Sequence, residues 1–283
     1  MDLPSFDLVV ATVDRVADLS RLLDSFERQT HRSFRVLLVD QNDDERAAAV
    51  IEDHPALEIL ELRAKRGLSH ARNAALPHLA AQIVAFPDDD CIYPDDLLER
   101  IARRFTDQRE LDGLSGRAVD PGGRSSPSWR PDGAELVADN LWNRVISFAV
   151  FLRREVVTEV GDFDEQLGLG APTPWSSGEE VDYIVRALES GFLIEYDPDL
   201  IVLHDERSLD GTGLQAIGRR DGASVGYILR KHGYPARVIA RMLLRPLGGA
   251  LLSAARGDID RARFHAATLQ GRVLGYRTRV RAG

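Results

Sequence analysis

Apolar residues in the first 90 positions of the chain form short continuous runs, which are separated by stretches with helical spacing. The runs have the length and composition of buried strands and cover residues 6–12, 34–40, 57–62 and 82–86. Apolar spacing between the runs predicts helices around 19–26 and over 43–53 and 68–79. This alternation predicts an α/β fold, with a mostly parallel, Rossmann-like sheet that is flanked by helices.

The later pattern predicts three more helices and one strand. Residues 179–190 have the pattern of a helix, and the apolar run 200–203 predicts a strand that ends at His204. Segment 237–256 predicts an amphipathic helix, which Pro246 should kink or break because proline lacks a backbone N–H. Asp258 is a suitable N-cap, so a last helix should run from there toward Tyr276.

The composition is that of a folded protein, with 44% hydrophobic and 29% charged residues among 283. A net charge of −9 argues against a general nucleic-acid binder, so we expect no nucleic-acid partner. The charge is unevenly distributed, because residues 230–283 contain twelve Lys or Arg and two Asp or Glu, a net of +10. We therefore expect an acidic body over 1–229 and a basic amphipathic helical tail over 230–283.

Two interpretations of the basic tail remain open. Arg237, Arg241 and Arg245 recur every four positions and share one face of the predicted helix. They either stay solvated while the tail packs on the body, or they contact anionic lipid headgroups at a membrane surface. We expect no membrane span, because the uncharged stretch 246–255 is far shorter than the about 20 residues that a span needs.

The compartment that the sequence favours is the cytoplasm, with a peripheral position at the inner face of the membrane if the tail binds lipid. The start of the chain lacks the basic and apolar regions of a signal peptide. Cys91 is the single cysteine, which excludes an internal disulfide and a cysteine-built metal centre. Both features are typical of proteins in a reducing compartment.

Polar residues follow three of the four predicted strands, at the edge where parallel sheets bind ligands. They are Thr12–Arg15, Asp40–Asp43 and Asp88–Asp90. A dinucleotide fold needs a glycine-rich turn after its first strand, but the first glycine here is Gly67, and the phosphate-loop signature is also absent. A classical dehydrogenase and a phosphate-loop nucleotide hydrolase are therefore disfavoured.

Three adjacent carboxylates, Asp88, Asp89 and Asp90, repel one another unless a cation or a proton relieves the charge. Magnesium and manganese prefer such oxygen ligands and usually share them with substrate phosphates. The triplet therefore indicates a divalent metal that holds a nucleoside diphosphate. The alternative is an acidic turn before the helix that follows Pro94, where Asp95 and Asp96 suit the helix dipole.

Six segments resemble, in order and spacing, motifs of the family-2 glycosyltransferases, which have the GT-A fold. They are Val10–Arg15, Val39–Asp40, Arg66–Asn73, Phe86–Pro94, Gly161–Glu165 and Ser177–Asp182. The resemblance covers most of residues 5–205. It implies a nucleotide-binding half over 1–119 and an acceptor half over 120–229. It also implies an inverting hexosyltransferase of polysaccharide or cell-envelope synthesis, which transfers a sugar from a nucleotide-diphosphate donor to a glycan or lipid-linked sugar.

The same resemblance assigns the site residues. Donor binding falls on Thr12, Arg15, Asp40, Gly67, Arg72, Asp88 and Asp89. Manganese or magnesium falls on Asp89, Asp90 and His204, with Asp88 nearer the ribose of the donor. Which of the three aspartates contacts the metal directly stays open, with Asp89 or Asp90 favoured. The general base falls on Glu180, and acceptor binding on Trp175, Glu179 and Asp182. The chain departs from the family at Val13-Asp14, where Tyr-Asn is common, and at Pro87, where many members have the first aspartate of the metal motif.

Structural roles compete with several of these assignments. Acidic residues in the first turn of a helix complement its dipole without any catalytic role. Arg66 and Arg72 flank Gly67, and each either pairs with diphosphate through its planar guanidinium or forms an ordinary surface ion pair. His204 and Trp175 are either ligands or packing residues.

Two other functions also remain open. A sugar nucleotidyltransferase uses a similar sheet but should have a glycine- and lysine-rich loop where this chain has only Arg15. A non-enzymatic module that binds a nucleotide-sugar or a polysaccharide would need no general base.

Overall fold

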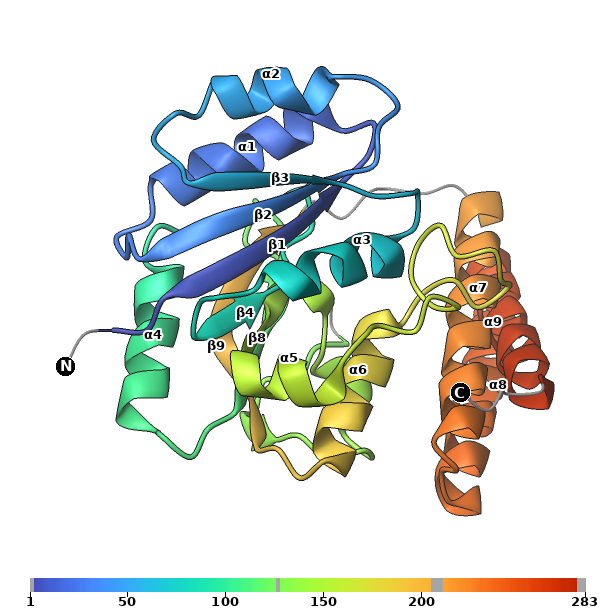
Figure 1. Ribbon diagram of the computed structural model, residues 1–283. Coiled ribbons are helices and arrows are strands. Elements are labelled where there is room, and N and C mark those ends of the chain that lie inside the picture. The colour runs from blue at the N-terminus through green and yellow to red at the C-terminus, as the bar shows by residue number, and fades with distance from the viewer. Residues whose placement is uncertain (1–2, 126–127, 205–210, 279–283) are drawn as a thin grey trace. The chain divides into compact units, whose positions relative to one another are not determined.

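The computed structural model describes residues 3–125, 128–204 and 211–278, with Gly211 and Thr212 described by their backbone alone (Figure 1). The chain forms two compact units. Unit 1 consists of Met1–Phe163 and Tyr183–Glu206, and unit 2 of Asp164–Asp182 and Arg207–Gly283. The predicted boundary between body and tail at 229/230 falls inside a helix, and the compact units divide the chain elsewhere.

The centre of unit 1 is one sheet with nine strands in the described part of the chain. The strands are β1 Phe6–Thr12, β2 Phe34–Asp40, β3 Ile59–Arg63, β4 Ile83–Ala85, β5 Cys91–Ile92, β6 Gly113–Val119, β7 Ala134–Glu135, β8 Val150–Arg153 and β9 Ile194–His204. They lie in the order β3-β2-β1-β4-β8-β6-β9-β5, and β7 pairs with β9. The first four strands are mutually parallel, whereas β8 runs antiparallel to β4 and β6.

Helices cover both faces of this sheet (Figure 1). They are α1 Val16–Glu27, α2 Arg46–Glu52, α3 Leu68–Ala75, α4 Leu97–Asp107, α5 Arg154–Val160 and α6 Glu179–Glu189, with 3-10 turns at Leu76–His78, Leu141–Asn143 and Ser147–Ala149. Helices α1 and α4 share one hydrophobic core with the sheet. Helix α3 packs on β1 and β2, and α6 begins in unit 2 and continues into unit 1. The four strands and the helices predicted in the first half of the chain are confirmed.

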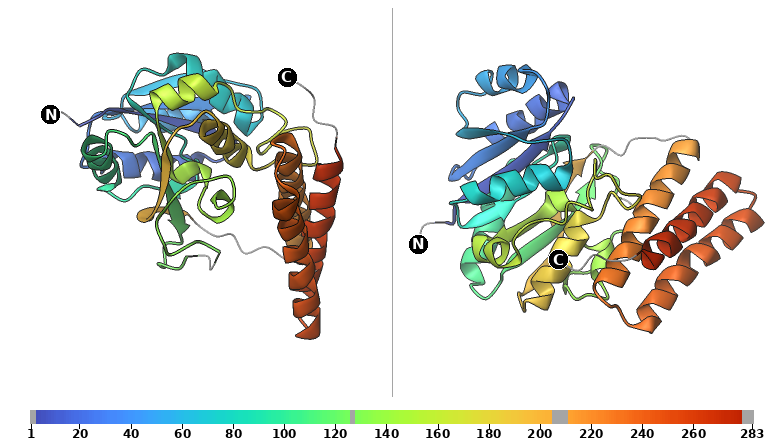
Figure 2. Two further views of the ribbon diagram at one scale, coloured as in Figure 1. Left: turned by 90° about the horizontal axis from the view of Figure 1, so that it is seen from below. Right: turned by 45° about the vertical axis from the view of Figure 1, so that its right-hand side comes forward.

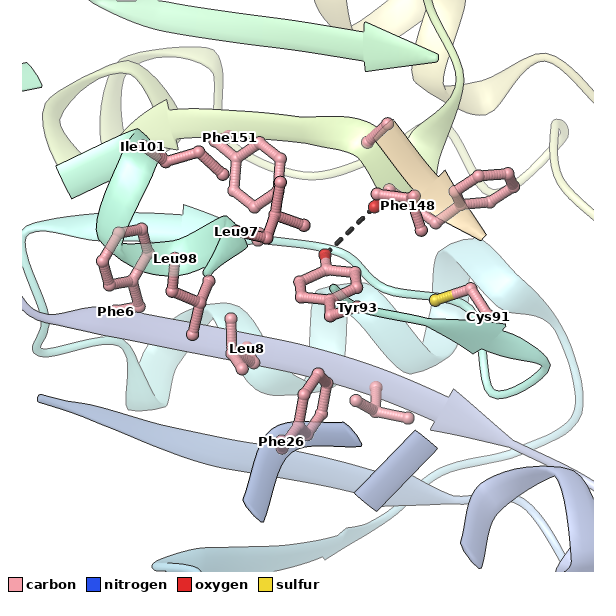
Figure 3. Packing of buried hydrophobic residues seen from close by; sticks show 14 of the residues in the cluster. Phe6, Leu8, Phe26, Cys91, Tyr93, Leu97, Leu98, Ile101, Phe148 and Phe151 are labelled. Carbon is pink, nitrogen blue, oxygen red and sulfur yellow. Dashed lines mark hydrogen bonds between the residues drawn. The ribbon is translucent and has the colours of Figure 1, made fainter. Parts of the chain in front are cut away.

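The core between α1, α4 and the sheet also fixes the start of β5 (Figure 3). Tyr93 is fully buried, meets Phe26 edge to face at 5.4 Å between ring centroids, and donates a hydrogen bond of 3.0 Å to the carbonyl of Phe148. Cys91 is also fully buried beside it. These contacts anchor the chain directly after Asp88–Asp90, so the aspartate loop, which carries these three residues, ends at a rigid base.

Unit 2 contains three long helices, α7 Gly211–Lys231, α8 Ala236–Ala255 and α9 Ile259–Arg277, which lie side by side (Figure 2). Helices α7 and α9 approach so closely that side chains would collide at their interface. A Cβ atom on Gly226 would clash with the backbone of Arg272, and one on Gly275 would clash with the backbone of Ala223. Glycine is therefore required where these helices cross.

Both predicted tail helices are present, with one correction. Asp258 is the N-cap of α9, and its carboxylate accepts a hydrogen bond of 3.0 Å from the backbone N–H of Arg261, as predicted. Of the kink or break predicted at Pro246, the break is absent, because α8 continues through it. The carbonyl that Pro246 cannot bond, that of Met242 four residues earlier, accepts a hydrogen bond from the guanidinium of Arg272 instead.

The expectation of no membrane span rested on the stretch 246–255, but the helix that contains this stretch is 20 residues long. By length and composition alone, α8 qualifies, and it is the single such helix among the described residues. Only 22% of the most apolar stretch of α8 is buried inside the protein.

Candidate functional site

The predicted donor residues of unit 1 converge where β1, β2 and β4 end. Strand β1 pairs in parallel with β2 on one side and with β4 on the other, and Ala11 forms an isolated bridge to Asp88. The turn after β1 and the aspartate loop after β4 are therefore neighbours. The sequence predicted this convergence from the polar ends of the strands.

Asp89 is bound from two sides at this edge. The Thr12 hydroxyl donates a hydrogen bond of 2.9 Å to its Oδ2, and a guanidinium nitrogen of Arg15 lies 3.1 Å from its Oδ1. The same nitrogen of Arg15 also donates to Asp90. Asp89 is only 6% exposed, and burial raises its pKa from 3.8 to about 6 despite these partners.

Asp90 is paired with His204. The register between β5 and β9 places Cys91 opposite His204, and Nε2 of His204 lies 3.3 Å from Oδ1 of Asp90. Burial acts to raise the pKa of Asp90, but His204 and Arg15 outweigh it and bring that pKa to about 2. The hydrogen bond to Asp90 raises the pKa of His204, whose ring stacks on Phe148 at 4.8 Å. Asp90 therefore stays ionised more firmly than Asp89.

The side chains at this edge fit a hard divalent cation as its ligands. The described residues nevertheless contain no preformed cluster of three or more His, Cys, Asp or Glu ligands. Asp89 and Asp90 offer carboxylate oxygens and His204 an imidazole, which are the ligands that manganese or magnesium accept. In this structure the guanidinium of Arg15 neutralises the two carboxylates instead. A cation would need Arg15 to release them, so the cation and Arg15 compete for the same oxygens.

Arg72 has a different position from the one that the sequence suggested. It is 1% exposed, and its guanidinium carbon lies 5.7 Å from the ring centroid of Phe86 and 5.4 Å from that of Phe163. One guanidinium nitrogen lies 3.2 Å from Oδ1 of Asp88. Arg72 thus supports Asp88 from inside the protein, and this burial argues against direct contact with a diphosphate.

Asp40 is also buried, at 1% exposure. Its Oδ1 accepts hydrogen bonds of 2.9 and 2.6 Å from the backbone and side-chain N–H groups of Asn42, and Arg63 lies 3.0 Å from its Oδ2. Oδ1 of Asn42 in turn accepts a hydrogen bond of 2.8 Å from the backbone N–H of Asp14. Asp40 therefore shapes the turn after β1 through Asn42, and this burial leaves it little surface for a nucleotide base.

The turn after β1 has one unusual backbone conformation, which is held by ion pairs. Asp14 has a φ of 59°, in the left-handed region that non-glycine residues rarely occupy. Its carboxylate lies 2.9 Å from Arg66 and 3.1 Å from Arg46. Arg66 is largely exposed, so of the two arginines that flank Gly67 it is the one available to a ligand.

Gly67 begins the segment that leads into α3. Its N–H donates a hydrogen bond of 2.7 Å to Oε1 of Gln41, and its φ of +136° suits glycine. Phe148 is a site neighbour that sequence reasoning missed, and Gln41 and Asn42 were named only as part of a polar strand end, without a role of their own. Gln41 and Asn42 follow Asp40 directly, so their place at the end of the second strand was an available signal.

In unit 2, the first turn of α6 carries the predicted general base. Glu180 is half-buried, and Glu179 is 4% exposed. Asp182 is fully buried, with Nζ of Lys231 and Nε2 of His232 each 2.8 Å from its Oδ1. Asp182 thus anchors the base-bearing turn to the end of α7, which argues against direct binding of an acceptor. Lys231 and His232 were not predicted, because nothing in the sequence pairs them with Asp182.

Trp175 packs inside unit 2. Its ring system stacks on Tyr227 at 5.2 Å between centroids with a 7° interplanar angle, and its buried indole N–H has no hydrogen-bond partner among the described residues. The Ser177 hydroxyl hydrogen-bonds to Asp221 at 2.9 Å and to Ser224 at 2.8 Å. The loop before Glu180 is therefore fastened to α7, and one face of the indole is covered.

The predicted residues thus gather in two groups. The structure brings Thr12, Arg15, Asp88, Asp89, Asp90 and His204 together in unit 1. It brings Trp175, Glu179, Glu180 and Asp182 together in unit 2. Gly67 and Asp40 lie beside the first group, joined to it through Gln41, Asn42 and Asp14.

Comparison with known families and proteins gives consistent matches. Residues 7–157 match the family model described as glycosyl transferase family 2. A pre-mycofactocin glycosyltransferase of Mycobacterium tuberculosis is 27% identical over 224 residues, covering 71% of this chain and 43% of that protein. Glycosyltransferase AglE of Haloferax volcanii is 24% identical, covering 72% of this chain and 68% of that protein. The chain therefore spans less than half of the mycobacterial relative.

Solved structures show the same fold at low sequence identity. The mannosyltransferase PcManGT from Pyrobaculum calidifontis, in complex with GDP-Man and Mn²⁺, has a TM-score of 0.65 at 16% identity and covers 96% of this chain and 88% of that one. S. aureus TarS 1-349 has a TM-score of 0.62 at 18% identity and covers 94% of this chain and 92% of that one. The GT-A fold predicted from the sequence motifs is confirmed.

Proposed function

Because the chain belongs to glycosyl transferase family 2, we propose that it transfers a hexose from a nucleotide-diphosphate donor to an acceptor hydroxyl with inversion at the anomeric carbon. The observation that carries the proposal is the linked group of Thr12, Asp89, Arg15, Asp90 and His204 at the ligand edge of the sheet. The relatives are named as glycosyltransferases, and two similar structures hold GDP-Man with Mn²⁺ and UDP-GlcNAc.

Asp89, Asp90 and His204 are the residues that would hold manganese or magnesium. A divalent cation bound there supplies positive charge for the diphosphate that leaves with the nucleoside. Asp90 stays ionised because His204 and Arg15 stabilise its charge, and Thr12 orients Asp89. Arg15, released from the carboxylates, would be free to pair with a phosphate oxygen through its planar guanidinium.

Arg72 and Asp88 have a supporting role in this account. The buried guanidinium of Arg72 fixes one oxygen of Asp88, whose side chain stays partly exposed. Arg72 thereby orients the Asp88 carboxylate for contact with the donor, and this orientation does not depend on a bound metal. Arg66, exposed at the rim of the turn, provides a second positive charge for the donor phosphates.

Glu180 is the general base in this proposal. The acceptor hydroxyl oxygen forms a bond to the anomeric carbon while the bond from that carbon to the diphosphate oxygen breaks, and the hydroxyl proton passes to the Glu180 carboxylate. The nucleoside diphosphate leaves with the electron pair. Asp182 holds the turn that bears Glu180, through its ion pairs with Lys231 and His232.

The acceptor in this proposal is a glycan or a lipid-linked sugar, and the enzyme acts in the cytoplasm at the inner face of a membrane. The support is the basic segment 230–283, which carries a net charge of +10 in a chain of net −9. A basic surface of this kind attracts anionic lipid headgroups.

Replacement of Glu180 tests the transfer step directly. Glu180→Gln keeps the shape of the side chain but removes the base, so donor binding should persist while transfer falls by about 10²–10⁴-fold. Glu189→Gln, at the exposed end of the same helix, is the matched control and should transfer normally. Normal transfer by Glu180→Gln would refute the assignment of the base. Absence of transfer in the unmodified protein with every donor that it binds would favour a binding module instead.

A further inference from the structure

Helix α8 presents an apolar strip to the outside of unit 2. Its buried side consists of Val238, Met242, Pro246 and Ser253. On the opposite side Leu244 and Leu251 are 62% and 65% exposed, and Leu252 and Leu247 on the two flanks are 53% and 42% exposed. Leucines with this much exposure, grouped on two turns of one helix, make a surface that water solvates poorly.

Arginines extend the same strip toward the start of the helix. Arg237, Arg241 and Arg245 are all exposed and recur every four residues, so they share the helix face that also carries Leu244 and Leu251. We call this surface the α8 face; it consists of Arg237, Arg241, Leu244, Arg245, Leu251 and Leu252. It carries three positive charges and no acidic residue, since α8 contains none.

We propose that the α8 face docks unit 2 on the surface of an anionic lipid bilayer, with α8 lying in the plane of the interface. Exposed leucines gain free energy by entering the boundary between headgroups and acyl chains. The arginines extend their stems along that apolar surface and reach the anionic headgroups. This proposal specifies which surface of the protein contacts the membrane that the proposed function includes. It rests on the proposed function for the link to a lipid-linked acceptor.

The way α8 is held in unit 2 favours a helix that lies on the membrane over one that crosses it. The side of α8 opposite the strip is buried against the rest of the unit, and the Met242 carbonyl is bonded by Arg272 of α9. A span would have to break that contact and carry Arg241 and Arg245 into hydrocarbon, where an arginine is costly. An interfacial helix keeps both the packing and the arginine–headgroup pairs.

Co-sedimentation of the full chain with vesicles tests this proposal. Neutral phosphatidylcholine vesicles are compared with vesicles that contain phosphatidylglycerol, at low and at high salt. The unmodified chain should bind the anionic vesicles at low salt and lose most of that binding at high salt. Replacing Arg237, Arg241 and Arg245 together by Gln should weaken binding on the order of 100-fold. Replacing Leu244, Leu251 and Leu252 together by Ser should also abolish most binding, with the basic charge intact.

Control variants remove the same number of arginines, or one exposed leucine, elsewhere in the chain. Arg21, Arg28 and Arg103, each more than half exposed in unit 1, are replaced together by Gln. Leu169, which is 50% exposed, is replaced by Ser. Both controls should bind vesicles like the unmodified chain. Circular dichroism and thermal unfolding establish that every variant is folded before its binding is compared.

Three outcomes would overturn the proposal. The first is equal binding of the unmodified chain to neutral and anionic vesicles. The second is a loss of binding in the unit 1 arginine control as large as in the α8 arginine variant. The third is dimerisation without lipid that the leucine variant abolishes, because this would assign the strip to a second copy of this chain. Nucleotide binding is measured on the same samples. If the unmodified chain binds the nucleotide but not the vesicles, the membrane inference alone is refuted. If it binds the vesicles but no nucleotide, the proposed function alone is refuted.

Discussion

A single guanidinium nitrogen of Arg15 lies 3.1 Å from Asp89 and donates a second hydrogen bond to Asp90, so this arginine neutralises the carboxylates that are proposed to bind metal. The arginine and a divalent cation cannot both occupy the space between the same oxygens. The metal-free protein is therefore stabilised by a contact that metal binding must break.

Replacement of Arg15 by Met should shift this balance. The metal-free variant should lose about 1–2 kcal/mol of stability, because two partly buried carboxylates are left without their partner. Added Mn²⁺ should stabilise the variant more than the unmodified protein, since no guanidinium competes for the oxygens. Thermal unfolding with and without Mn²⁺ measures both effects. A smaller metal-induced shift in the variant would contradict the competition.

The stability of the metal-free protein should depend on Asp89 in a pH-dependent way. Burial raises the pKa of Asp89 from 3.8 to about 6, so the folded protein holds this proton more tightly than the unfolded chain. The stabilising contribution is fully present below about pH 4 and is lost as the pH rises through about 6. Asp89→Asn, which cannot ionise, should therefore gain stability over the unmodified protein as the pH rises, by up to about 3 kcal/mol at pH 8.

Urea unfolding of the metal-free proteins between pH 4.5 and 8 checks this dependence. Asp95→Asn is the matched control, because the Asp95 side chain is 61% exposed and should give a difference that hardly changes with pH. A constant difference between Asp89→Asn and the unmodified protein would show that burial does not raise the pKa of Asp89.

The Asp182 anchor should matter for stability and for turnover. Asp182→Asn leaves Lys231 and His232 beside a neutral amide in a buried place, which should cost about 2–4 kcal/mol. The rate constant kcat should fall more than KM changes, because the turn that bears Glu180 loses its support. Asp260→Asn, on an aspartate of α9 that is 67% exposed, is the control and should change both little. A large rise in KM with unchanged kcat would instead assign Asp182 to acceptor binding.

Close packing of α7 on α9 predicts opposite effects for two glycine replacements. Gly275→Ala should destabilise unit 2 by several kcal/mol, because the new methyl group would clash with the backbone of Ala223. Gly248→Ala, on α8 with open space around it, should stabilise by about 0.5–1 kcal/mol through helix propensity. Thermal unfolding compares the two. Equal effects would mean that the helices do not approach so closely.

Much of the fold could be predicted from local patterns. The first four strands and their helices follow from apolar periodicity, and the N-cap at Asp258 follows from its side chain. Helix α7 was not predicted beyond its last residues, because its glycines obscure the apolar pattern. The spacing Gly218, Gly222, Gly226 was nevertheless an available signal of close helix packing.

The roles of single site residues were harder to predict, because burial depends on tertiary packing that the sequence does not display. Arg72 and Arg66 both flank Gly67, yet Arg72 is enclosed by two phenylalanines while Arg66 is exposed. The carboxylate of Asp182 is likewise bound by Lys231 and His232, which lie about 50 residues away in the chain. Motif order therefore pointed to the candidate site, whereas three-dimensional contacts distinguish the residues that are proposed to bind ligands from those that support them.

The most direct test of the central claim is thermal unfolding with UDP, dTDP, GDP and ADP, each with and without Mn²⁺, for the unmodified chain and for Asp90→Asn. A ligand that binds the folded state raises its stability in proportion to occupancy. The account predicts that one of these diphosphates stabilises the unmodified chain only when Mn²⁺ is present, and that Asp90→Asn loses this shift. No shift with any nucleotide, or the same shift in Asp90→Asn, would contradict a metal–diphosphate site at Asp88–Asp90.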